Sequence, residues 1–434
     1  METYKKNLLA YLLAIILFFP FAANLSIVML FFVSVFGAYS LIHQRPKQPN
    51  AYYTYFILLM MYAVGFVLYE FAFMPRDPIT VINWNTGIMF AALLLLVPKS
   101  TVIDRNKLAL SAIITISLLF LIGSILISGC GTFFKIDFFR EAYQKGCVSA
   151  AIRFFSRNSL MVSSMVLVIS HMCILYDGTR VQKLLGYIGY LLGLVTVLFV
   201  TDSRGAALAF VAMFPIVTEY TRRRENIRLK KAILLSMIIA ALIASIIYTT
   251  LPEQKLSRYF GAFGQALNFN TSVQIDSTAY ARVVTYEAAV DAFMAKPITG
   301  YGMSNRWTAL EPYIDTFSNQ SGHSNNAALN HLVSGGIFGL MLFFLVTLFP
   351  VVSKYRSKPQ NRDEIYLAAI VAAALHGNGL TTAIFSHYMH GTFWAVALVF
   401  SLMITFDPKL INTKQNQLET RRAATVAKKQ NAVY

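Results

Sequence analysis

The sequence predicts an all-α, polytopic membrane protein. Hydrophobic residues make up 56% of the 434 positions and charged residues only 13%, whereas a soluble protein carries about 25% charged residues. Apolar runs also recur along the chain, each near the ~20 residues that a helix needs to cross a bilayer. We predict about twelve transmembrane helices. The predicted spans are 8–23, 24–42, 53–71, 81–97, 109–128, 158–175, 184–200, 205–220, 232–250, 327–352, 365–384 and 392–406.

The distribution of basic residues predicts the orientation of these helices. If the N-terminus lies inside and the helices alternate, most of the 37 lysines and arginines fall in inner segments, as the positive-inside rule requires. Both termini are then cytoplasmic, and the net charge of +17 reflects topology, with no nucleic-acid partner expected. The most basic inner segment, 221–231, contains Arg222, Arg223, Arg224, Arg228, Lys230 and Lys231.

The predicted spans divide the chain into four regions. Residues 1–250 hold helices one to nine, and 251–326 form a large outer loop between helices nine and ten. Residues 327–407 hold helices ten to twelve, and 408–434 form a basic cytoplasmic tail. A loop as long as 251–326 is unusual unless it has a function. We therefore expect the functional site in this loop and at the helix ends beside it.

Within the outer loop, residues 278–293 predict an amphipathic helix. Ser277 or Thr278 can cap its N-terminus. Pro297 and the flexible turn Gly300-Tyr301-Gly302 follow its end. Its predicted apolar stripe consists of Val283, Ala288, Ala289 and Phe293.

The cysteines predict no metal site, because no metal-ligand spacing is present. Cys130 and Cys147 share an outer segment, where an oxidising compartment permits a disulfide; two free thiols are the alternative. Cys173 falls within a predicted helix and is interpreted as a packing residue.

Arg204 is the first candidate for a binding site. It lies directly before the predicted helix 205–220, whose N-terminus faces outward and favours an anion through its free N–H groups and its dipole. Asp202 is a capping residue, and Gly205 permits close approach to the backbone. An arginine at this place suits a diphosphate. The alternative is an interfacial arginine paired with Asp202.

Arg282 and His323 are the other two candidates. Arg282 projects from the loop helix one turn before Tyr286, and the alternative is an ordinary solvated arginine. His323 precedes helix ten, where Ser324, Asn325 and Asn326 are capping residues. A histidine pKa near 6.5 suits a general base for a sugar hydroxyl, and the alternative is an incidental loop histidine.

Three other histidines, His171, His331 and His376, fall within predicted helices. We interpret them as hydrogen-bonded packing groups. The sequence contains no nucleophile motif of the G-x-S-x-G kind and no H-E-x-x-H metal motif. No metal and no cofactor are expected.

Three motifs occur in the order found in the bacterial O-antigen ligase and polymerase superfamily, which this chain resembles over about residues 195–345. They are TDSRGAALAF, then YARVVTYEAAVDAF with PITGYG, then GHSNNAALNHLVSGGIFGL. Each motif is weak alone, and the set is fairly specific. Chain length and the single outer loop look most like O-antigen ligase.

The resemblance implies a GT-C-like, metal-independent, inverting glycosyltransferase of the bacterial inner membrane, active at its periplasmic face. Its donor would be undecaprenyl-diphosphate-linked O-antigen, and its acceptor lipid A–core in lipopolysaccharide biosynthesis. By the same resemblance, Arg204, Gly205 and Arg282 would bind the diphosphate, and His323 would deprotonate the acceptor hydroxyl. The supporting residues would be Asn325, Asn326, Tyr286 and Asp202.

One departure from the family pattern affects the histidine. The family has nine residues between the pair beginning with His and the Gly-x-x-Gly motif, whereas eleven separate Ser324 from Gly336 here. A strict count places the histidine position at Asn325, and a two-residue extension before the helix restores His323. Two alternatives to a ligase remain. One is an O-antigen polymerase, and the other is a lipid-linked sugar transporter.

Overall fold

The structure is a computed structural model that describes seven ranges of the chain and isolated residues elsewhere. All regular elements in the described part are helices, with no strand among them, in agreement with the all-α prediction. The seven ranges are 50–73, 78–96, 204–224, 227–231, 277–314, 326–356 and 363–380.

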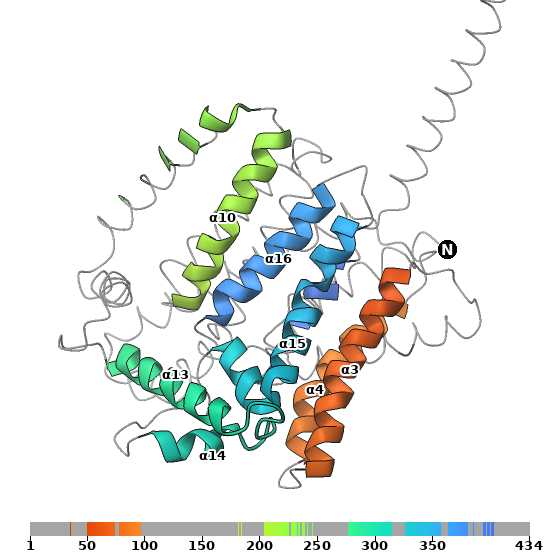
Figure 1. Cartoon of the computed structure of the whole chain (residues 1–434). Helices are drawn as coiled ribbons and strands as arrows, with labels where there is room; N and C mark the ends of the chain where they lie inside the picture. The colour runs from red at the N-terminus through yellow and green to blue at the C-terminus, as the bar shows by residue number, and fades with distance from the viewer. Residues whose placement is uncertain are drawn as a thin grey trace, which may run out of the picture.

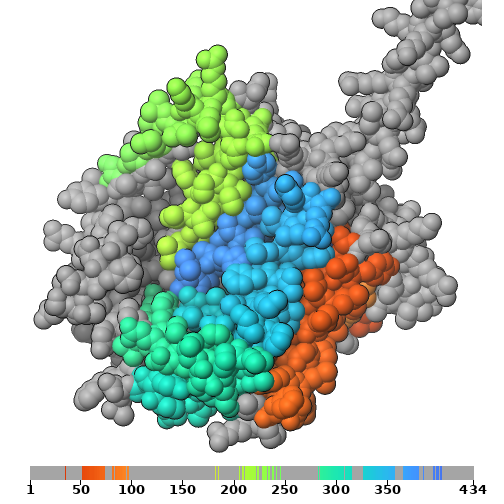
Figure 2. Space-filling model, viewed as in Figure 1, coloured from red at the N-terminus to blue at the C-terminus, as the bar shows by residue number. Residues whose placement is uncertain are grey.

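Five of the described helices form a bundle, and three further helical elements lie across one end of it (Figure 1). α3 packs against α4 and α15, α15 packs against α16, and α16 packs against α10. α13 and α14 pack against α15 and form one continuous surface that adjoins α3 in Figure 2. The bundle helices are α3 (Asn50–Phe73), α4 (Pro78–Leu93, continued by η2, Leu94–Leu96), α10 (Arg204–Arg224), α15 (Ala327–Arg356) and α16 (Asp363–Gly379). The end elements are α13 (Ser277–Ala295), α14 (Arg306–Leu310) and η6 (Glu311–Tyr313).

Two described helices are long and apolar enough to cross a membrane, Ala51–Phe73 and Ala327–Arg356. They correspond to the predicted spans 53–71 and 327–352. Helices are also present at the predicted spans 81–97, 205–220 and 365–384. The other predicted spans lie wholly or largely outside the described residues. The number of twelve spans, the extent of the loop and the four regions therefore stay predictions.

Helix α15 is not continuous, although its predicted span was. Gly335 and Gly336 have non-helical backbone angles, and Gly336 has a φ of +59° with a ψ of −151°. Only glycine adopts this conformation readily. The break separates a short first segment, Ala327–Ser334, from the remainder of α15. Hydropathy alone predicted one span because the glycines do not interrupt the apolar composition.

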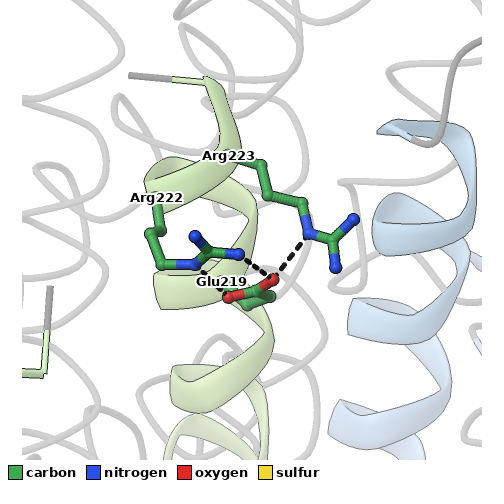
Figure 3. A network of polar contacts seen from close by, with 3 residues as sticks. All are labelled: Glu219, Arg222 and Arg223. Carbon is green, nitrogen blue, oxygen red and sulfur yellow. Dashed lines mark hydrogen bonds and ion pairs between the residues drawn. The ribbon is translucent and has the colours of Figure 1, made fainter. Parts of the chain in front are cut away.

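Helix α10 extends beyond its predicted span 205–220 and ends at Arg224. The prediction placed 221–224 in a loop because hydropathy falls there. Arginine is a good helix former, however, and Glu219 supports the extension from within the helix. Its carboxylate accepts hydrogen bonds from Arg222 at 2.6 and 2.8 Å and from Arg223 at 2.6 Å (Figure 3).

Candidate functional site

Helix α13 packs closely on the first segment of α15 because its buried side chains are small. Ala288, Ala289 and Ala292 are buried and contact Val333 of α15. This confirms the helix and the alanines of its predicted stripe. Ala309 and Leu310 of α14 complete the same core cluster. The outer-loop helix is therefore fixed against α15 rather than free in solvent.

The turn Gly300-Tyr301-Gly302 contacts α15 at the Gly335–Gly336 break. The N–H of Tyr301 donates to the carbonyl of Val333 and that of Gly302 to the carbonyl of Ser334, both at 2.8 Å. A Cβ at Gly300 would lie 2.6 Å from the backbone nitrogen of Gly336. The break thus leaves carbonyl groups that the loop turn satisfies. The predicted turn is confirmed, and these hydrogen bonds hold it in place.

Arg282 is partly buried on α13, and its Nε is inaccessible to solvent. Arg282 is therefore partly shielded from solvent, and its role in the site stays a prediction. One turn along α13, the Tyr286 hydroxyl donates to the carbonyl of Leu380 at 2.6 Å. Burial raises the pKa of Tyr286, against the opposing effects of the Arg282 charge and a hydrogen bond from Asn326. Arg282, Tyr286 and Asn326 therefore form one cluster.

Asn326 caps the first segment of α15, as the sequence predicted. Its Oδ1 accepts the backbone N–H of Leu329 at 3.1 Å. The cap satisfies one of the free N–H groups at a helix start. Because Asn326 also contacts Tyr286, the start of α15 is fixed beside Arg282.

The start of α10 lies at the same end of the bundle. Helices α10 and α16 run antiparallel and touch closely: a Cβ at Gly377 would lie 2.8 Å from the carbonyl oxygen of Leu208. Arg204 lies one helical turn before Leu208, and Leu380 lies about one turn after Gly377. Since Leu380 accepts the Tyr286 hydroxyl, the start of α10 and the middle of α13 both adjoin the end of α16. Gly205, the second residue of α10, is buried there.

Comparison with known protein families identifies the segment that carries these elements. Residues 189–344 match the model of a family described as O-antigen ligase. The match spans 156 of the 434 residues and supports the O-antigen ligase superfamily for this segment. No curated protein matches the chain at a significant level. The matched segment contains α10, α13, α14 and the first half of α15, and it confirms the resemblance over about 195–345.

Several predicted residues of the O-antigen ligase segment lie outside the described residues. They are Asp202, His323 and Asn325, together with the side chain of Arg204. Their roles stay predictions. The described members of the predicted set are Gly205, Arg282, Tyr286 and Asn326, and the last three lie together.

The sequence analysis missed a buried polar cluster that joins the O-antigen ligase segment to α3 and α4. Glu70 in the last turn of α3 accepts the backbone N–H groups of Met303 at 3.0 Å and Ser304 at 3.1 Å. The guanidinium of buried Arg306 lies 4.7 Å from the centre of the Trp84 ring on α4. Burial lowers the pKa of Arg306 to about 10, although Tyr62 and Glu70 act to raise it. Arg306 therefore remains a cation at neutral pH.

A signal for this cluster was present in the sequence. Glu70 is an acidic residue within the apolar run 53–71, and an ionisable group in a membrane helix indicates a functional role by default. Its partner could not be inferred, because Arg306 has no distinguishing motif. His331 is buried and hydrogen-bonded, as predicted. Its Nε2 contacts the Tyr62 hydroxyl at 2.6 Å and its Nδ1 the carbonyl of Ala327 at 2.5 Å.

Proposed function

We propose that the protein is an O-antigen ligase that transfers undecaprenyl-diphosphate-linked O-antigen to a sugar hydroxyl of lipid A–core. The observation that carries this proposal is the convergence of three elements within the matched segment. The starts of α10 and α15 and the Arg282 turn of α13 adjoin the end of α16. The proposed diphosphate site comprises Arg204, Gly205 and Arg282, the residues that these elements bring to one end of the bundle.

The chemistry follows from the charges at this end. The acceptor hydroxyl oxygen attacks the anomeric carbon, the bond from that carbon to the diphosphate oxygen breaks, and His323 takes the hydroxyl proton. Arg204 and Arg282 stabilise the negative charge that develops on the undecaprenyl diphosphate leaving group, an electrostatic contribution that requires no metal. Attack from the face opposite the diphosphate inverts the anomeric centre.

The covalent chain keeps the proposed base close to this site. His323 is three residues before Asn326, so their Cα atoms are at most about 11 Å apart. Asn326 in turn contacts Tyr286, one turn from Arg282. This short separation in sequence supports His323 as the proposed base.

Helix α10 supports a periplasmic location for the site. Arg204 begins the helix, and Arg222, Arg223 and Arg224 end it. A 21-residue helix is about 30 Å long, close to the thickness of the hydrocarbon core. Since clustered arginines favour the cytoplasmic side, the Arg204 end is assigned to the periplasmic side of the inner membrane.

The test is a transfer assay with the purified full-length protein, undecaprenyl-diphosphate-linked O-antigen and lipid A–core, in the presence of a metal chelator. We expect transfer by the wild type, and kcat lower by about 10²–10³ in Arg204→Ala and Arg282→Ala, as for loss of one donor to a developing anion. His323→Ala should also lose transfer. Arg223→Ala, an arginine at the opposite end of α10, is the matched control and should keep wild-type activity.

Each alternative has a distinct outcome. Elongation of carrier-linked repeats without use of lipid A–core would identify a polymerase. Full activity in His323→Ala together with loss of activity in Asn325→Ala would show that Asn325 occupies the histidine position of the family pattern. A histidine base would then be rejected. Wild-type movement of the lipid-linked glycan across the membrane without transfer would favour a transporter.

A further inference from the structure

The carboxylate of Glu70 is buried completely at the end of α3 that faces α14. It accepts three hydrogen bonds from one short turn: the N–H groups of Met303 and Ser304, and the Ser304 hydroxyl. Hydrogen bonds to an ionised group are among the strongest in proteins. Glu70 therefore attaches the turn between α13 and α14 to α3.

The surrounding backbone is shaped to accept this carboxylate. Gly302 has a φ of +84°, and a Cβ there would lie 2.7 Å from Oε2 of Glu70. The turn therefore requires glycine for both its conformation and its contact. Arg306 follows in the same segment, feels the charge of Glu70, and lies over Trp84 of α4. Both helices of the α3–α4 pair thus hold the segment 302–306.

The segment 302–306 is coupled to the first segment of α15. At its start, Tyr301 and Gly302 donate backbone hydrogen bonds to Val333 and Ser334. A second connection from α3 reaches the middle of Ala327–Ser334, where Tyr62 contacts His331. Helix α3 therefore contacts Ala327–Ser334 directly at His331 and, through the 302–306 turn, at Val333 and Ser334.

This attachment matters because the break at Gly335–Gly336 separates Ala327–Ser334 from the rest of α15. The long membrane helix cannot by itself orient the short segment that precedes the break. Asn326, beside Tyr286, caps that segment. The position of the segment therefore determines where Asn326 lies relative to Arg282.

We propose that Glu70 is a positioning residue. With Arg306 it fixes the 302–306 turn on α3 and α4, and thereby holds the start of α15 beside Arg282 for transfer. This role rests on the function proposed above. If Glu70 has this role, transfer also depends on α3 and α4, although both helices lie outside the family match 189–344.

Hydrogen-exchange mass spectrometry and transfer kinetics on the full-length protein test this role together. In Glu70→Gln we expect amide exchange in 300–306 and 327–334 to accelerate at least tenfold, and exchange in α10 to stay unchanged. With rates expressed per donor-binding site, kcat should fall at least tenfold at unchanged donor KM. A merely structural loss would reduce the number of donor-binding sites and leave kcat per site unchanged.

Two further variants keep the test decisive. Ser304→Ala removes one donor to Glu70 and leaves both charges in place, so it should fold and show the same pattern with a few-fold effect. Glu219→Gln is the matched control, because Glu219 also accepts hydrogen bonds, from Arg222 and Arg223, but is partly exposed; this variant should change neither measurement. Wild-type exchange and kcat in both Glu70→Gln and Ser304→Ala would overturn the positioning role while the ligase function stands. A wild type without transfer would overturn the ligase function, and the exchange data would still show whether Glu70 holds α15.

Discussion

Two sets of glutamate, arginine and aromatic ring occur at opposite ends of the helical bundle, and they differ mainly in burial. In the first, Glu70 and Arg306 are 0% and 7% exposed, and Arg306 lies 4.7 Å from the Trp84 ring. In the second, the Glu219 and Arg223 side chains are 30% and 39% exposed, and Arg223 lies 5.6 Å from the Tyr366 ring. The same chemistry therefore occurs in two dielectric environments.

The difference teaches how a charge pair is used in this protein. Around Glu219, water solvates the charges, so the interaction supports the end of one helix and contributes little energy. Around Glu70, water is excluded, and each charge depends on its protein partners. The Glu70 set also joins α14 to α3 and α4, which are distant from α14 in sequence. The buried Glu70 set is thus a fixed connection between helices at the end of the bundle that carries the candidate site, whereas the Glu219 set is a local contact.

Removing the arginine from each set should give the largest contrast. Arg306→Ala leaves the buried Glu70 carboxylate without its cation, and we expect a loss of about 3–5 kcal/mol of unfolding free energy. Arg223→Ala should cost less than about 1 kcal/mol. Denaturant unfolding of both variants in the same detergent measures the difference. Equal losses would show that burial does not separate the two sets.

A smaller loss should come from the glycines beside the buried set. Gly336→Ala places a side chain on a backbone conformation reserved for glycine, at a cost of about 1–3 kcal/mol, and against the carbonyl of Ile298. Gly65→Ala, on α3, meets no atom within 4 Å and should be neutral or stabilising by up to about 1 kcal/mol. The unfolding free energies of Gly336→Ala and Gly65→Ala should therefore differ. This difference tests whether the close contact at the α15 break stabilises the end of the bundle that carries the candidate site. A tolerated Gly336→Ala would contradict the geometry at the break.

A contrast between local and long-range contacts also explains which features the sequence could predict. The α13 helix, the start of α10 and the Asn326 cap depend on neighbouring residues, and all three were predicted closely. The contacts of Glu70 with Met303 and Ser304, and of Tyr62 with His331, join residues far apart in the chain, and no local pattern specifies them. The break in α15 was missed because a Gly-Gly pair becomes non-helical only when the loop turn supplies hydrogen-bond donors to Val333 and Ser334.

The smallest predicted effect is the salt dependence of the exposed set. At ~1 M salt the Debye length falls to about 3 Å, so exposed charges are largely screened, whereas buried pairs are screened much less. Glu219→Gln should therefore cost less than about 1 kcal/mol at low salt and nothing measurable at ~1 M salt. The cost of Glu70→Gln should be nearly the same at both salt concentrations. Denaturant unfolding in urea, which adds no ions, measures all four values. If salt removed the cost of Glu70→Gln as well, water would have access to the Glu70 set, and the connection between α3 and the start of α15 would be weaker than its geometry indicates.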